Sequence, residues 1–175
     1  DTTPIIKRFE NEYPDRKLLP EDPALSFINY LLEDFGDEWV TKYMFHYRWY
    51  FEEDANNAST ILPLSDLATD MDDGTLKEVK KMIHDRQHGR LWVVGSNDTT
   101  AKLIDSSYRR FVKLMDDHLS VSRFLFGEKP SSADFAIYGQ LTQLIGFDPT
   151  SIRIASENSL RLVSWVDVMA DLSGH

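Results

Sequence analysis

Apolar residues recur at spacings near three and four between residues 24 and 51, which predicts one long amphipathic helix with a single buried stripe. Gly36 lies in the middle of this helix. A glycine there lowers helix stability by roughly 1 kcal/mol relative to alanine, so a bend is expected at this point. The predicted stripe consists of Leu25, Ile28, Leu32, Phe35, Trp39, Phe45 and Trp49.

The same periodicity predicts four helices in the second part of the chain. Gly89 suits the end of the first, and Gly146 and Pro149 close the third. In the second, an inward stripe is expected from Leu103, Ile104, Tyr108, Phe111, Leu114 and Met115. The four helices are expected over residues 75–88, 99–119, 132–144 and 160–172.

A short helix is also expected at the start of the chain, with Thr3 as its N-cap and Pro4 in its first position. It should end near Tyr13, because the residue before a proline is pushed out of the helical region. Residues 17–23 contain two prolines and two acids and predict a linker at a domain boundary.

Other segments are expected to be irregular. Residues 53–59 are polar and rich in asparagine, and are predicted to form a loop or a frayed helix end. Residues 91–94 are apolar but have no nearby segment to pair with as a strand, and residues 124–127 indicate an apolar turn. With no convincing sheet, the fold class is all-α, a helical bundle.

Composition narrows the choice of function. The chain has 175 residues, of which 42% are hydrophobic, enough for a real core. Its net charge of -10 disfavours binding to nucleic acid or to an anionic membrane. It contains no cysteine, which removes disulfides and thiolate nucleophiles and fits a cytoplasmic protein. No apolar run approaches a membrane span, and the start is not a signal peptide.

The most informative motif begins the predicted helix at residues 132–144. Ser131 can accept from the N–H of Asp134, whose carboxylate can reach back to the N–H of Ser131, which makes a capping box. Pro130 and Phe135 occupy the hydrophobic-staple positions. Taken alone, the motif indicates only a good helix start.

Its surroundings resemble the C-terminal all-helical domain of the glutathione S-transferase superfamily. An apolar turn precedes the box, a helix with small residues follows it, and an Asp148-Pro149 turn leads to a last helix that carries Trp165. The resemblance implies that Ser131 and Asp134 nucleate the central helix and have a structural role.

The N-terminus is similar to the end of the family's thioredoxin-like domain. By this resemblance, Asp1 and Thr2 would hold the γ-glutamyl end of glutathione. Thr2 stands where the family more often has serine, and Pro4 where it has a small residue. The resemblance implies two parts, residues 1–19 as the last helix of a truncated thioredoxin-like domain with its linker, and residues 20–175 as the all-helical domain.

The resemblance implies that the parent protein binds glutathione and transfers it to, or reduces, an apolar electrophile. A homodimer is expected, with no nucleic acid, no membrane and no metal. The chain contains no counterpart of the family's thiolate-activating residue, so no catalytic residue is assigned and the isolated chain is expected to be inactive. The alternatives are a non-catalytic interaction module with the same helical fold and a stand-alone ligand-binding helical protein.

Residues 39–50 are densely aromatic. The family resemblance implies a second-substrate pocket here, and Tyr43, His46, Tyr47 and Tyr50 fall on adjoining helix faces that could line it. Packing in the core or at an interface is the competing interpretation for each of them. His46, on a stripe with Glu38 and Lys42, is either an acid–base group or a histidine bonded by a neighbouring helix.

Other polar groups suggest little chemistry. His84 and His88 have metal-pair spacing without a third ligand, and His118 receives no role. The triplets at Asn57 and Asn97 fit the glycosylation pattern, which is frequent by chance. Four acids on the long helix are predicted to form a solvated face: Glu33, Asp34, Asp37 and Glu38.

Overall fold

The computed structural model describes residues 2–172 and is all-α over that range, with a single isolated β-bridge. The all-α part of the fold-class prediction is therefore confirmed. In chain order the elements are α1 (Thr2–Glu12), η1 (Pro14–Arg16), α2 (Pro23–Asp34), η2 (Phe35–Val40), α3 (Thr41–Tyr50), α4 (Glu52–Asp66), α5 (Asp73–His88), η3 (Leu91–Val94), α6 (Ala101–Leu119), α7 (Ser132–Leu144), α8 (Pro149–Asn158) and α9 (Leu160–Ala170).

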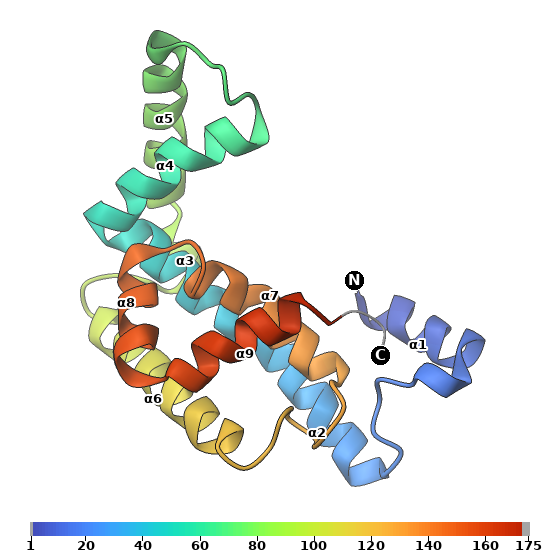
Figure 1. Cartoon of the computed structure of the whole chain (residues 1–175). Coiled ribbons are helices and arrows are strands. Elements are labelled where there is room, and N and C mark those ends of the chain that lie inside the picture. The colour runs from blue at the N-terminus through green and yellow to red at the C-terminus, as the bar shows by residue number, and fades with distance from the viewer. Residues whose placement is uncertain (1, 173–175) are drawn as a thin grey trace.

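Helix α7 lies at the centre of the bundle. It packs against α2, η2, α3 and α9, while α6 runs along α8 and α9 (Figure 1). Its residues Ile137, Leu141 and Leu144 are buried, whereas its opposite side reaches the surface at Phe135 and Gly139. The larger apolar cluster of the molecule gathers around α7 from α3, α6, α8 and α9.

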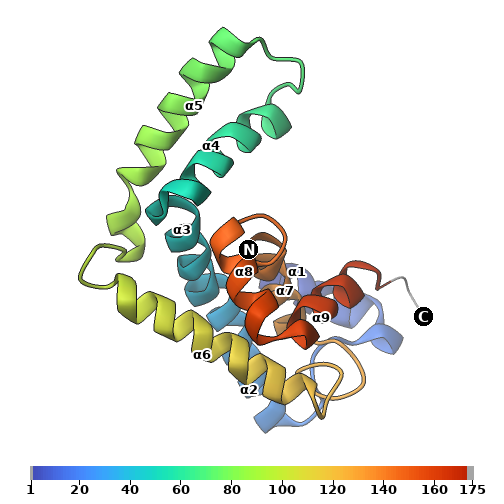
Figure 2. The same cartoon turned by 60° about the vertical axis from the view of Figure 1, so that its left-hand side comes forward.

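Helices α4 and α5 form a hairpin that extends away from the rest of the molecule (Figure 2). Its base is held by a smaller cluster around Trp49, Ala55, Ala58 and Leu91. Helix α5 contains no buried residue, so the arm is attached mainly through α4.

The long aromatic helix is continuous in space but not uniform. A six-residue π-helical turn, η2, joins α2 to α3 at the position of Gly36. A Cβ on Gly36 would lie 3.0 Å from the backbone carbon of Ala136 and 3.0 Å from the nitrogen of Ile137. The glycine is therefore needed for the close approach to α7, and it lies in a π-helical turn where the sequence predicted only a bend.

The predicted stripe on this helix is only partly buried. Trp49 is buried, but Leu25, Ile28 and Trp39 are 43%, 43% and 54% exposed. The prediction was wrong for α2 because α7 covers only one side of it, the side that carries Asn29 and Glu33. On α6, Leu103 and Leu114 are likewise exposed, while Tyr108, Phe111 and Met115 are in the core as predicted.

Three further predictions need correction. The polar segment 53–59 belongs to α4, whose first turn carries Glu52, Glu53 and Asp54, acids that the positive helix N-terminus stabilises. Helix α8 replaces a simple turn at Asp148-Pro149, because Pro149 suits the first helical position. Thr3 lies inside α1 and is not its N-cap, and its hydroxyl donates to the side chain of Glu33 in α2.

The turn before α7 matches the sequence prediction. Phe124 and Gly127 exchange two backbone hydrogen bonds, of 2.9 and 3.2 Å, and Phe124 is buried. Gly127 has a φ of 112°, a conformation that glycine adopts without strain. The turn thereby directs the chain into α7.

Substitution of Gly36 by alanine should destabilise the protein by about 1–3 kcal/mol, because the new methyl group would press on the backbone of α7. Gly139 is the matched control, since it is also helical but has open space around its Cβ position. Gly139→Ala should stabilise by about 0.5–1 kcal/mol. Urea denaturation measures both, and equal effects of the two substitutions would contradict the close contact.

Candidate functional site

Helix α7 begins on a buried carboxylate. Asp134 is fully buried and accepts hydrogen bonds from the N–H of Leu125 at 2.9 Å, the N–H of Ser131 at 2.8 Å and the hydroxyl of Ser131 at 2.7 Å. Ser131 and Asp134 form a reciprocal capping box. One carboxylate thus fixes both the helix start and the preceding turn.

The next residues of α7 extend this cluster to two other helices. The hydroxyl of Ser132 donates to Glu33 at 2.6 Å and accepts from the side-chain amide of Asn29 at 2.7 Å. The N–H of Ala133 donates to the Asn29 oxygen at 3.2 Å, and Thr3 of α1 donates to the second Glu33 oxygen at 2.6 Å. We call these bonds, with those of Asp134, the α7-start network; its residues are Thr3, Asn29, Glu33, Leu125, Ser131, Ser132, Ala133 and Asp134.

The network corrects the prediction for the acids of the long helix. Glu33 is 4% exposed and lies inside the network, so it is not part of a solvated face. Asp37, four residues further along, is exposed, and its pKa is raised from 3.8 by burial and by the neighbouring charges of Glu33, Glu38 and Asp34. The pattern that could have revealed the network is the polar pair Asn29 and Glu33, four residues apart on a largely apolar helix.

A second feature is an apolar groove with a volume of about 840 Å³, between the α2–η2–α3 helix and α6. Its polar groups are few, and the hydroxyls of Tyr43 and Ser107 lie 3.0 Å apart in its wall. The ammonium of Lys42 lies 4.2 Å from the ring centre of Trp39. The groove is lined by Leu32, Phe35, Trp39, Tyr43, Ser107, Arg110, Phe111, Leu114, Met115, His118, Leu125 and Ile137.

Three of the four predicted pocket residues cluster together, but outside the groove: the ring centre of His46 lies 5.4 Å from that of Tyr47 and 4.7 Å from that of Tyr50. Tyr43 lines the groove, but Tyr47 is fully buried and donates to Asp105 at 2.8 Å. Tyr50, about two turns after Tyr43, donates to Asp98 at 3.0 Å. The ring of Tyr47 packs on Tyr108 and Phe51, so the core takes up this part of the aromatic segment.

His46 is also in the interior, not on a polar stripe with Glu38 and Lys42. Its Nδ1 lies 2.8 Å from the hydroxyl of Ser96, its ring stacks on Tyr50, and its buried Nε2 has no partner among the described residues. Burial lowers its pKa from 6.5 to about 4, although Asp105 opposes the shift. His46 is therefore neutral near pH 7 and packs as a core histidine.

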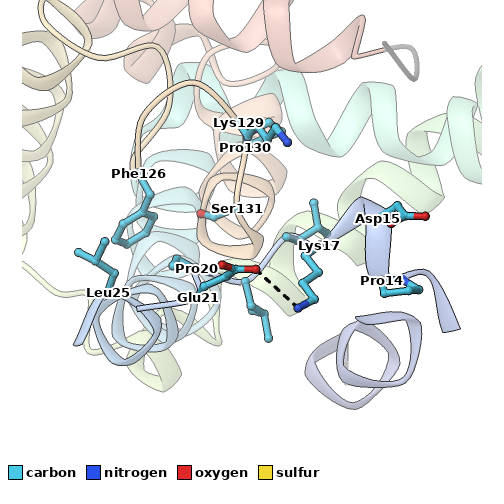
Figure 3. Close-up of a pocket in the computed structure, with 12 residues that line it drawn as sticks. Pro14, Asp15, Lys17, Pro20, Glu21, Leu25, Phe126, Lys129, Pro130 and Ser131 are labelled. Atoms are coloured by element: carbon cyan, nitrogen blue, oxygen red, sulfur yellow. Dashed lines mark ion pairs between the residues drawn. The ribbon is translucent and has the colours of Figure 1, made fainter. Parts of the chain in front are cut away.

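A smaller cavity of about 330 Å³ lies where the linker passes the loop before α7 (Figure 3). Leu25, Phe126 and Pro130 supply its apolar walls, and Lys17 pairs weakly with Glu21 at 3.7 Å. Ser131 lies at its inner side, so the cavity borders the α7-start network.

The predicted glutathione-binding residues cannot be placed. Asp1 lies outside the described residues, and so does the side chain of Thr2, the first residue of α1. Groups of three or more potential metal ligands are absent from the described residues. The rings of His84 and His88 stack, and His88 Nδ1 lies 3.1 Å from the carbonyl oxygen of Trp49.

Sequence reasoning missed most of the groove. Ser107, Arg110 and Leu114 recur at spacings of three and four on α6, but periodicity assigned Leu114 to the core. The available signal was a leucine four residues from an arginine, and therefore on the same face of the predicted helix.

Comparison with known proteins gives no assignment: no protein-family model matches the chain, and no curated protein sequence matches it. Over the described residues, no helix combines the length and the apolar character needed to cross a membrane.

Replacing Asp134 by alanine should cost about 3 kcal/mol of stability, because the amides of Leu125 and Ser131 would lose their acceptor in a buried site. Asp72 is the matched control, an exposed N-cap that accepts from Gly74 and Thr75 at the start of α5. Asp72→Ala should cost about 1 kcal/mol. Chemical denaturation measures the stability of both variants, and equal losses of stability would contradict the account.

His46 should make folding sensitive to acid. The unfolded chain binds a proton near pH 6.5 and the folded protein only near pH 4, so the free energy of unfolding should fall as the pH drops through this window. The loss should be on the order of 2 kcal/mol.

The measurement compares the pH dependence of stability in the native protein and in His46→Gln, which cannot titrate. Burial raises the pKa of Asp148 to about 6, although Arg48 opposes the shift. Asp148 titrates in both proteins, so its contribution to the pH dependence cancels in the difference. Identical pH profiles would show that His46 is not buried in its neutral form.

Proposed function

We propose that this chain is the helical part of a glutathione S-transferase-like protein that transfers glutathione to, or reduces, an apolar electrophile. The observation that carries the proposal is the buried capping box of Ser131 and Asp134 at the start of the central helix, the position that the family resemblance requires. Had this pair been on an outer, solvated helix, the resemblance would have lost its basis.

The surface of α1 supports the same proposal. Ile5 and Phe9 of α1, and Tyr13 directly after it, are 53%, 49% and 57% exposed. An exposed apolar side of this kind is typical of a helix that packs against the rest of a domain to which it belongs. In the proposal that domain is thioredoxin-like, its last helix is α1, and Asp1 and Thr2 hold the γ-glutamyl group of glutathione.

The groove is the proposed second-substrate site. It is concave, mostly aromatic and aliphatic, and within the size range of small-molecule sites. The chemistry itself would take place at the glutathione thiolate, whose sulfur attacks the electrophile after a nearby donor has stabilised the charge. Since no thiolate-activating residue is assigned to this chain, residues 1–175 alone should not catalyse the reaction.

A non-catalytic interaction module with the same fold is the second candidate. It is favoured by the outer side of α2, where Phe27, Tyr30 and Leu31 are 62%, 53% and 48% exposed. Aromatic surfaces of this kind are common at protein interfaces. The same surface would suit the expected homodimer, which light scattering of the purified protein tests.

The deciding experiment uses the natural full-length protein. It should be retained on immobilised glutathione, be eluted by free glutathione and conjugate 1-chloro-2,4-dinitrobenzene. Trp39→Ala should raise KM for this electrophile about tenfold, because the substitution removes apolar surface from the groove.

The matched control is Trp92→Ala, which removes an indole ring that is 75% exposed and does not line the groove. Neither substitution should change retention on glutathione. Absence of both retention and conjugation would refute the enzyme proposal and favour the interaction module. Robust conjugation by residues 1–175 alone would contradict the proposal that this chain contains no thiolate-activating residue.

A further inference from the structure

The wall of the apolar groove differs in charge from the rest of the molecule. The chain has a net charge of -10, yet the residues that line the groove include no aspartate or glutamate. Four other cavities each have at least one carboxylate in their walls, among them Glu21, Glu128, Glu10 and Glu33. The groove is therefore a site without the acidic groups that repel anions.

Arg110 supplies a positive charge at this site. It lines the groove from α6, is exposed, and has no ion-pair partner in the described part of the chain. Its neighbours three and four residues away on α6 are Ser106, Ser107, Lys113 and Leu114, none of which is acidic. The adjacent Arg109, by contrast, pairs with Asp105 at 2.8 Å. An acid on the same helix therefore neutralises Arg109, whereas Arg110 has no such partner within the described range.

The groove thus combines a long apolar surface with a single unpaired guanidinium. Trp39, Phe111 and Leu114 offer contact for a hydrocarbon or aromatic body, and the hydroxyl of Ser107 is a second possible donor. A guanidinium binds a carboxylate with two parallel hydrogen bonds, which gives orientation as well as affinity.

We propose that the groove binds apolar molecules that carry one carboxylate, with the carboxylate paired to Arg110 and the apolar body along Trp39, Phe111 and Leu114. This inference rests on the proposed function only in treating the groove as the second-substrate site. It names the substrate class, an apolar electrophile with an anionic end, and Arg110 as the residue that selects it.

The test uses the 175-residue chain and needs no glutathione. The neutral fluorescent probe N-phenyl-1-naphthylamine reports binding to the groove, and decanoate and decan-1-ol are compared as competitors. The native protein should bind decanoate more tightly than decan-1-ol. In Arg110→Gln the affinity for decanoate should fall about tenfold, while the affinity for the neutral probe stays the same.

Two further variants locate the effect. Lys113→Gln removes a positive charge from the same helix but outside the groove, and should leave decanoate binding unchanged. Leu114→Glu places a charge in the groove at a position that is 61% exposed, and should weaken both the probe and decanoate.

The proposal fails if decan-1-ol competes as well as decanoate, if Arg110→Gln has no effect, or if Lys113→Gln has an equal effect. It also fails if Leu114→Glu leaves probe binding intact, since the probe would then bind elsewhere. Selective decanoate binding in a protein that does not retain glutathione would remove the proposed function and leave this inference standing.

Discussion

The buried carboxylate of Asp134 is the constraint on which the rest of the structure depends. A charged group in the interior is costly unless donors surround it, and three donors from the turn and the helix start do so here. The carboxylate also lies at the N-terminus of α7, where the helix dipole favours a negative charge. The entry of the chain into its central helix is therefore fixed at one point.

The residues that follow Ser131, the capping partner of Asp134, connect this helix start to other helices. Ser132 and Ala133 bond Asn29 and Glu33 of α2, and Glu33 in turn accepts from Thr3 of α1. About one turn further on, Gly36 lets the long helix approach the backbone of α7. Polar contacts at one end and close packing at the other thus set the position of α2 and η2 relative to α7, and with it one wall of the groove.

The sequence was sufficient for the parts of the fold that local chemistry decides. The bounds of α7, the capping box and the turn at Gly127 follow from caps and turn residues, and each is present. Burial was harder to predict, because periodicity identifies an apolar side of a helix but not whether another element covers it. Leu25, Ile28 and Leu114 are exposed for this reason.

The site was less predictable than the fold. The α7-start network joins residues about a hundred positions apart, such as Asn29 and Ser132, and only the packing of α2 on α7 brings them together. Helical spacing placed His46 and Tyr47 on faces that could line a pocket, but the core absorbs both. The net charge follows directly from the composition, but the absence of acids from the wall of the groove depends on how the chain is arranged in three dimensions.

Native-state hydrogen exchange tests the central claim most directly. The amides of Leu125 and Ser131 donate hydrogen bonds to Asp134. If Asp134 anchors the fold, these amides should exchange only through global unfolding, with a free energy of opening equal to the free energy of unfolding from denaturation. The amides of Gly74 and Thr75, held by the exposed Asp72, should exchange through local opening and much faster. Equally fast exchange at both helix starts would contradict the account.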